Sequence, residues 1–190
     1  MNRKAFTLIE LLVVLAIIGL IVALGVPQLK RVFRANLKSA SVRISGMVRY
    51  AYDAAAINGR IYRIVFDFDK STYRLEVSNT DQLVSLSEED NNNNSDSTAT
   101  KPPDYSPAVG EAGKEYKLPN GVVFDSIENL NTRTKIMEEI GYLYFFPQGR
   151  TEEMIIRLKG DKNNTGYYSI RVASSNAKTK IEGRYIEAEK

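Results

Sequence analysis

Cysteine and histidine are both absent from the 190 residues. Without cysteine the chain has no disulfide, no zinc-thiolate site and no thiol nucleophile. An exported domain of this chain must therefore be stabilised by its hydrophobic core and by contacts with its partners. Without histidine it lacks the most common general base and the most common metal ligand. We therefore expect no catalytic residues, no metal site and no cofactor, and we predict that the protein is not an enzyme.

An excess of charge of one sign is also lacking. The formal net charge is only +3, from 26 basic and 23 acidic residues. If residues 1–5 are removed, two of the basic residues leave with them and the chain becomes nearly neutral. Bulk charge therefore attracts neither nucleic acid nor an acidic membrane surface, and we do not expect nucleic acid as a partner.

What the chain does have is a long apolar run close to the N-terminus. In the stretch 6–29 the only polar side chains are those of Thr7, Glu10 and Gln28. As a helix this stretch is roughly 30 Å long or slightly more, about the thickness of a hydrocarbon core. The basic residues before it predict a cytoplasmic N-terminus and an exported C-terminal domain. An ordinary secretory signal fits less well, because no small-x-small cleavage site follows the run.

Glu10 is the informative residue of this run. A carboxylate so deep in lipid is costly unless it is paired. In a chain cut after Ala5, the nearest basic side chain is that of Lys30, about 30 Å along the helix. The remaining candidate partner is a free amine at Phe6, created by cutting the Ala5–Phe6 bond. In a helical bundle that amine could belong to a neighbouring subunit, and the pair would then fix the stagger of adjacent helices.

The sequence Arg-Lys-Ala-Phe-Thr-Leu-Ile-Glu-Leu-Leu-Val-Val-Leu-Ala-Ile-Ile-Gly-Leu resembles the class III signal of type IV pilins and type II secretion pseudopilins. The resemblance implies that residues 1–5 are a leader, that prepilin peptidase cuts between Ala5 and Phe6, and that the new N-terminus at Phe6 is methylated. It also implies that Thr7 and Glu10 act in filament assembly. The protein would then be a single-pass protein of the bacterial inner membrane with a periplasmic C-terminal domain. Ala5 departs from the family, which usually has glycine there.

Pro27 interrupts an otherwise continuous helical pattern, because proline removes one backbone hydrogen bond and clashes with the preceding turn. Two interpretations stay open: a flexible point that helps the subunit leave the bilayer, or a bend at the membrane exit. Beyond it, apolar residues spaced by three and four predict an amphipathic periplasmic helix over residues 30–58. Its face would consist of Leu29, Phe33, Leu37, Ala40, Ile44, Met47, Ala51 and Ala55. Asn58-Gly59 is a natural stop.

From residue 60 to residue 190 the hydrophobic period falls to two, which indicates a β domain. We predict seven or eight short, mostly antiparallel strands in two sheets, near 62–68, 72–77, 116–118, 122–124, 142–146, 154–159, 167–173 and 181–186. Packed against the long helix, they give an α+β fold. Residues 79–114 are polar and acidic and are predicted to be a flexible insertion, since the acidic spacing matches no EF-type calcium loop.

Two motifs of this domain, Leu118-Pro119-Asn120-Gly121-Val122 and Phe145-Phe146-Pro147-Gln148-Gly149-Arg150, resemble the minor pseudopilin H group. Pro147 and Gly149 suit a tight structural turn. The resemblance implies a minor subunit near the tip of a type II secretion pseudopilus, with other minor pseudopilins, the major pseudopilin and prepilin peptidase as partners. The alternative is a minor pilin of a type IV pilus that primes assembly or binds surfaces or DNA. Its DNA candidates would be Arg171, Lys178, Lys180 and Arg184.

Overall fold

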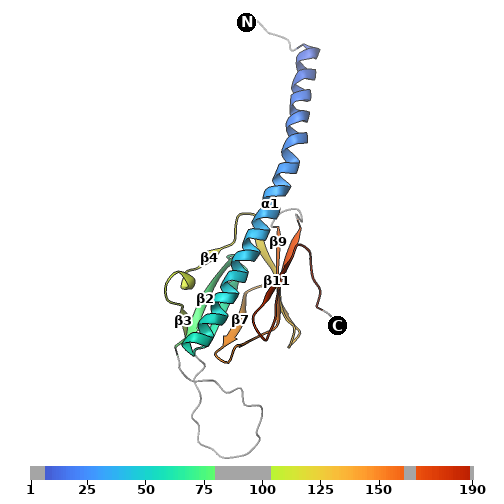
Figure 1. Ribbon diagram of the computed structural model, residues 1–190. Helices are drawn as coiled ribbons and strands as arrows, with labels where there is room; N and C mark the ends of the chain where they lie inside the picture. Colours follow the sequence, from blue (N-terminus) through green and yellow to red (C-terminus); the bar gives the residue numbers. More distant parts are fainter. Residues whose placement is uncertain (1–6, 80–103, 161–165, 189–190) are drawn as a thin grey trace, which may run out of the picture.

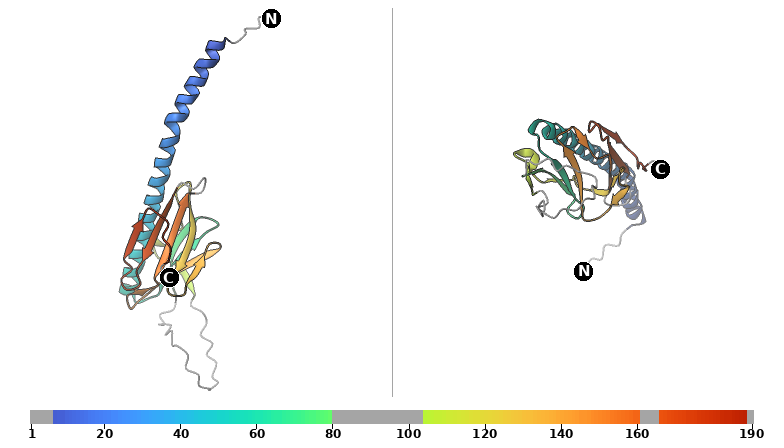
Figure 2. Two further views of the ribbon diagram at one scale, coloured as in Figure 1. Left: turned by 90° about the vertical axis from the view of Figure 1, so that its right-hand side faces the viewer. Right: turned by 90° about the horizontal axis from the view of Figure 1, so that it is seen from below.

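The computed structural model describes residues 7–79, 104–160 and 166–188, without the side chains of residues 22–33. It contains one long helix, α1 (Leu8–Asn58), followed by a β domain with two antiparallel sheets (Figure 1). The C-terminal half of α1 lies along the β domain, whereas its N-terminal half projects away from it (Figures 1 and 2). The predicted α+β architecture of a long helix and two sheets is therefore confirmed.

Both ends of α1 are set by local signals. Thr7 adopts extended backbone angles and caps the N-terminus with its side chain, while Gly59 takes a left-handed conformation with φ of 63° at the other end. Glycine reaches this conformation without the steric cost that a β-carbon brings, so the helix ends where Asn58-Gly59 predicts.

The face of α1 that meets the sheets is a stripe of fully buried apolar side chains at helical spacing. Its members are Leu37, Ala40, Ile44, Val48, Ala51 and Ala55. Two members of the predicted face, Leu29 and Phe33, have side chains outside the described part of the structure. Among the other members the observed face differs at one position, since Val48 is buried where Met47 was expected and Met47 is only half-buried at the edge. Small alanines in the stripe let the sheets approach the helix closely, and the larger side chains fill the space between them.

Sheet A carries the predicted hairpin of β1 (Tyr62–Asp67) and β2 (Thr72–Ser78) at its centre. Its strands run in the order β3-β2-β1-β7-β8, and β4 pairs separately with β2. The added strands are β3 (Tyr105–Pro107), β4 (Tyr116–Lys117), β7 (Ile140–Phe146) and β8 (Arg150–Thr151). A short 3-10 helix, η1 (Glu111–Gly113), lies between β3 and β4.

Sheet B has the order β11-β10-β9-β5-β6. Its strands are β5 (Val122–Asn129), β6 (Thr134–Ile136), β9 (Met154–Gly160), β10 (Tyr167–Val172) and β11 (Thr179–Glu182). The inner faces of both sheets pack with α1 into one hydrophobic cluster that includes Phe66, Phe145 and Ile156. The strands flanking Pro119-Asn120-Gly121 therefore separate, because β4 joins sheet A and β5 joins sheet B.

Three expectations need correction. The described residues form eleven strands rather than seven or eight, because three strands that were not predicted, β3, β6 and β8, are short pieces of two or three residues that leave little periodicity in the sequence. The predicted insertion 79–114 is not structureless at its end, since β3 pairs with β2 and η1 follows it; residues 80–103 lie outside the described residues. The last strand is β11 over Thr179–Glu182 rather than 181–186.

Candidate assembly segment

Thr7 and Glu10 lie together at the start of α1. The Thr7 hydroxyl oxygen accepts a hydrogen bond from the backbone N–H of Glu10 at 3.4 Å, and the Thr7 carbonyl oxygen accepts from the same N–H at 3.1 Å. The carboxylate of Glu10 therefore lies in the first turn, where the partial positive charge of the helix terminus favours an anion. Ala5 and Phe6, the predicted processing positions, lie outside the described residues.

The side chains around Glu10 are apolar and exposed over almost four turns. They are Leu8, Ile9, Leu11, Leu12, Val13, Val14, Leu15, Ile17, Ile18, Leu20 and Ile21. Contiguous apolar surface of this extent marks contact with another molecule or with lipid. Within the part of the chain that the structure describes, no helix combines the length and the apolarity needed to cross a membrane.

The other predicted positions lie elsewhere in the fold. Position 27 lies inside α1, which continues through it from Leu8 to Asn58. Pro147 and Gly149 belong to the turn between β7 and β8, in which the Gly149 N–H donates to the Phe146 carbonyl at 3.1 Å. The Tyr52 hydroxyl donates to the Gly149 carbonyl at 3.1 Å. This turn therefore attaches the edge of sheet A to α1.

Three of the four candidate DNA-binding residues form ion pairs with neighbouring acids. Arg171 pairs with Glu153 at 2.8 Å, and Lys180 and Arg184 both pair with Glu182, at 2.9 and 2.8 Å. Lys178 is exposed and forms no ion pair with another described residue. Two acids therefore offset part of the charge of these four cations, which weakens the attraction to a row of phosphates without removing it.

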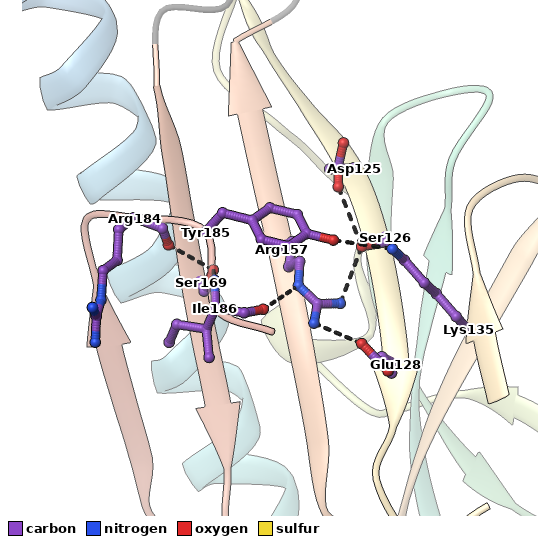
Figure 3. Close-up of polar contacts among 9 residues, drawn as sticks. All are labelled: Asp125, Ser126, Glu128, Lys135, Arg157, Ser169, Arg184, Tyr185 and Ile186. Atoms are coloured by element: carbon purple, nitrogen blue, oxygen red, sulfur yellow. Dashed lines mark hydrogen bonds and ion pairs between the residues drawn. The ribbon is translucent and has the colours of Figure 1, made fainter. Parts of the chain in front are cut away.

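A polar cluster on the outer face of sheet B was not predicted. Arg157, on β9, is only 1 % exposed. Its guanidinium donates to the Glu128 carboxylate at 2.6 Å, to the Ser126 hydroxyl at 3.2 Å and to the Ile186 carbonyl at 2.7 Å (Figure 3). The signal was present in the sequence as one arginine inside the apolar strand Met154–Gly160, because a charge in such a place must be paired.

The chain after β11 covers this cluster as an extended strap, residues 183–188. Ser169 on β10 holds it twice, donating to the Arg184 carbonyl at 2.8 Å and accepting from the Ile186 N–H at 3.1 Å (Figure 3). The Tyr185 ring lies 4.8 Å from the Arg157 guanidinium, and its hydroxyl accepts from Lys135 on β6 at 3.0 Å. The strap thus ties the outer strands of sheet B together.

Groups with shifted pKa values lie at several places in the β domain, and two of them, Arg63 and Tyr105, are in contact on sheet A. Burial raises the pKa of Glu152, between β8 and β9, whereas the backbone N–H of Lys70 lowers the pKa of Asp67 at the β1–β2 turn. Lys180, together with Arg184, lowers the pKa of Glu182 on β11. Among the described residues no three acidic side chains come close enough to hold a metal ion.

Comparison with known proteins addresses the N-terminal segment and the domain separately. Residues 1–26 match the family described as the prokaryotic N-terminal methylation motif. Type IV major fimbrial protein FimA of Dichelobacter nodosus is 34 % identical over 58 residues, which are 30 % of this chain and 37 % of that protein. The minor pseudopilin EpsH from the type 2 secretion system of Vibrio cholerae shares the fold with a TM-score of 0.51 and 11 % identity, over 78 % of this chain and 97 % of EpsH.

The methylation motif, the similarity to FimA and the fold shared with EpsH support the predicted resemblance to the type IV pilin and pseudopilin class. The motif covers the capped start of α1 with Thr7 and Glu10, and the likeness in fold to EpsH covers most of the molecule. The chain spans little more than a third of the length of the FimA relative that it matches.

Proposed function

We propose that the chain is a minor pseudopilin of a type II protein secretion system, a structural subunit near the tip of the periplasmic pseudopilus. In this proposal prepilin peptidase removes residues 1–5, the amine of Phe6 is methylated, and residues 6–29 anchor the subunit in the inner membrane and then in the filament core. Residues 60–190 form its periplasmic domain. The methylation motif and the projecting apolar half of α1 support this assignment.

The observation that carries the proposal is the position of Glu10. It is one acid among exposed apolar side chains, and it forms no ion pair with any other residue that the structure describes. A helix whose only task is to cross a bilayer gains nothing from a carboxylate, which costs about 3 kcal/mol at mid-membrane on insertion scales. An amine at the terminus of a neighbouring subunit would offset that cost and set the register between helices.

The likeness to EpsH in fold favours a minor pseudopilin over other members of the class. The second candidate is a minor pilin of a type IV pilus, which the match to the fimbrial protein FimA supports. Deletion of the gene separates the two. Loss of exoprotein release with intact twitching and DNA uptake supports the pseudopilin, and the reverse phenotype supports the pilin.

The test of assembly is Glu10→Leu in the full chain. We expect unchanged or improved membrane insertion, because leucine is favoured in lipid, but at least a tenfold loss of the subunit from sheared filaments. A matched control moves the acid by one turn, combining Glu10→Leu with Val14→Glu. This control should not restore incorporation, because the charge no longer meets the neighbouring amine. Normal incorporation of Glu10→Leu, or protein purified from cells that still begins with Met1, contradicts the proposal.

A further inference from the structure

An open groove lies beside α1 within the β domain. Met47 and Tyr50 of α1 form one wall, Tyr73 and Tyr116 line it from sheet A, and residues 109–112, at the start of η1, form the other wall. Its volume is about 710 Å³. The groove therefore joins the half of α1 that packs on the sheets to the segment between β3 and β4, which sequence patterns had assigned to a flexible insertion.

The walls of the groove are fixed by contacts of their own. The rings of Tyr73 and Tyr116 stack with centroids 5.7 Å apart, and the Tyr116 hydroxyl donates to the Glu111 carbonyl at 2.8 Å. The Ala108 N–H donates to the Leu75 carbonyl at 2.9 Å, which ties the far wall to β2. A partner consequently meets a preformed surface. Binding then costs little conformational entropy in the groove itself, which favours the complex.

The lining is apolar where a soluble surface would be expected to be polar. Tyr50 is 50 % exposed and Val109 is 92 % exposed. Gly46 lies on the same side of α1, and a β-carbon added there would meet no atom within 4 Å. Single exposed apolar side chains are common, but a group of them lining one groove marks an interaction site.

The charge of the groove is one-sided. Arg43 lies at its edge on α1 and forms no ion pair with an acid in the described ranges. Glu111 on the opposite wall is already neutralised by Lys114, whose ammonium lies 2.6 Å from the carboxylate. The groove thus presents one uncompensated positive charge beside an apolar surface, and its complement is an apolar side chain close to a carboxylate.

We propose that this groove binds an amphipathic helical segment of a different pilin-class subunit, with an aliphatic or aromatic side chain against Tyr73 and Tyr116 and a carboxylate on Arg43. The inference rests on the proposed function, because a minor subunit near a filament tip meets other subunits rather than copies of itself. Docking of an apolar helix face into a preformed groove is a common recognition mode, and the fixed walls suit it.

The experiment places a photoreactive benzoylphenylalanine at Val109 of the full chain, in cells that assemble the filament. The exposed side chain of Val109 makes this exchange compatible with folding. We expect a crosslink to a helical segment of another pilin-class subunit, with an Asp or Glu within one turn of the crosslinked residue. Arg43→Glu should reduce the crosslink at least tenfold, and reversing the charge of that partner acid should restore it.

Matched variants separate the groove from general effects on α1. Lys38→Glu reverses another exposed charge of the same helix outside the groove and should leave the crosslink unchanged. Gly46→Leu fills the groove and should abolish the crosslink, whereas Ala35→Leu adds the same side chain to an exposed position outside it and should have no effect. Circular dichroism of each purified full chain verifies that the fold is kept.

Crosslinks confined to lipid or to a second copy of the chain overturn the proposal, as does a partner crosslink that Arg43→Glu leaves unchanged. This failure is distinguishable from failure of the proposed function. If Glu10→Leu removes the subunit from filaments while the groove variants change nothing, the subunit assembles as proposed and the groove is not its docking site.

Discussion

Replacement of Arg157 by methionine should destabilise the domain strongly. Methionine keeps much of the aliphatic volume of arginine but removes the guanidinium, which donates to Glu128, Ser126 and the Ile186 carbonyl. Breaking a buried ion pair by removing one partner costs about 3–5 kcal/mol, because the other charge stays behind. The side chain of Glu128 is 17 % exposed, so water can still solvate part of its charge. We therefore expect the loss of the ion pair to cost about 3 kcal/mol of stability, the lower end of that range.

Weaker attachment of the strap adds a second contribution. The Arg157 guanidinium anchors the Ile186 carbonyl at 2.7 Å and lies 4.8 Å from the Tyr185 ring. One hydrogen bond to a charged group and one cation–π contact together contribute about 2 kcal/mol. However, the more mobile strap regains conformational entropy that offsets much of it. The total cost of Arg157→Met should therefore be about 3–4 kcal/mol.

The assay is urea unfolding of the purified full chain in mild detergent, followed by far-ultraviolet circular dichroism, since the chain has no tryptophan. A double-mutant cycle with Glu128→Leu isolates the ion pair. Each single variant leaves one buried charge unpaired, whereas the double variant leaves none. We expect the double variant to be at least 2 kcal/mol more stable than the sum of the single effects predicts. Additive single effects, or a cost of Arg157→Met below 1 kcal/mol, would refute this reasoning.

Two further predictions concern the turns beside the sheets. Burial raises the pKa of Glu152, so the native state binds its proton more tightly than the unfolded chain and stability falls as pH rises above the ordinary value of 4.5. Glu152→Gln should therefore stabilise the protein at pH 7 by less than about 1 kcal/mol, because the group is partly solvated, and the gain should vanish at pH 4 in urea titrations. Gly149 has φ of +72°, and a β-carbon there would lie 3.0 Å from the Tyr52 hydroxyl. Gly149→Ala should lower the free energy of unfolding by about 1–2 kcal/mol, and Tyr52→Phe should lower it by about 1 kcal/mol. If the contact between the new β-carbon and the Tyr52 hydroxyl is responsible, the double variant should lose less than the sum of the two single losses. Thermal melts of the three variants measure these changes.

Elements with local signals were predictable from the sequence. The end of α1 at Asn58-Gly59 and the hairpin of β1 and β2 follow from residues close together in the chain: a glycine stop and two alternating runs joined by a short turn. The stripe centred on Ile44 followed from helical spacing for the same reason. Its error at Val48 arises because the two sheets, not the helix alone, decide which flank is covered.

Elements that depend on distant partners were not predictable. The strap 183–188 has no hydrophobic periodicity. It is held by residues that come much earlier in the chain: Ser169 lies 15 residues before its partner Arg184, and Arg157 lies 29 residues before its partner Ile186. β3 is three residues long and exists because β2 offers it a free edge. The candidate assembly segment was predictable to the extent that one acid in an apolar run is conspicuous, whereas the groove required the fold to bring residues 43–50 next to residues 109–116.

The two halves of α1 suggest how one helix serves two tasks. In the C-terminal half, the core stripe around Ile44 is buried by the sheets, so only the side of the helix that faces away from the sheets, with Arg43 and Tyr50 on its flank, remains for other molecules. Over residues 8–21 the described apolar side chains are exposed on all sides of the helix around Glu10. A partner that binds the first half must therefore surround it, whereas a partner of the second half approaches from one side. Variants of Glu10 should consequently affect every neighbour in the filament, and variants of Arg43 only one.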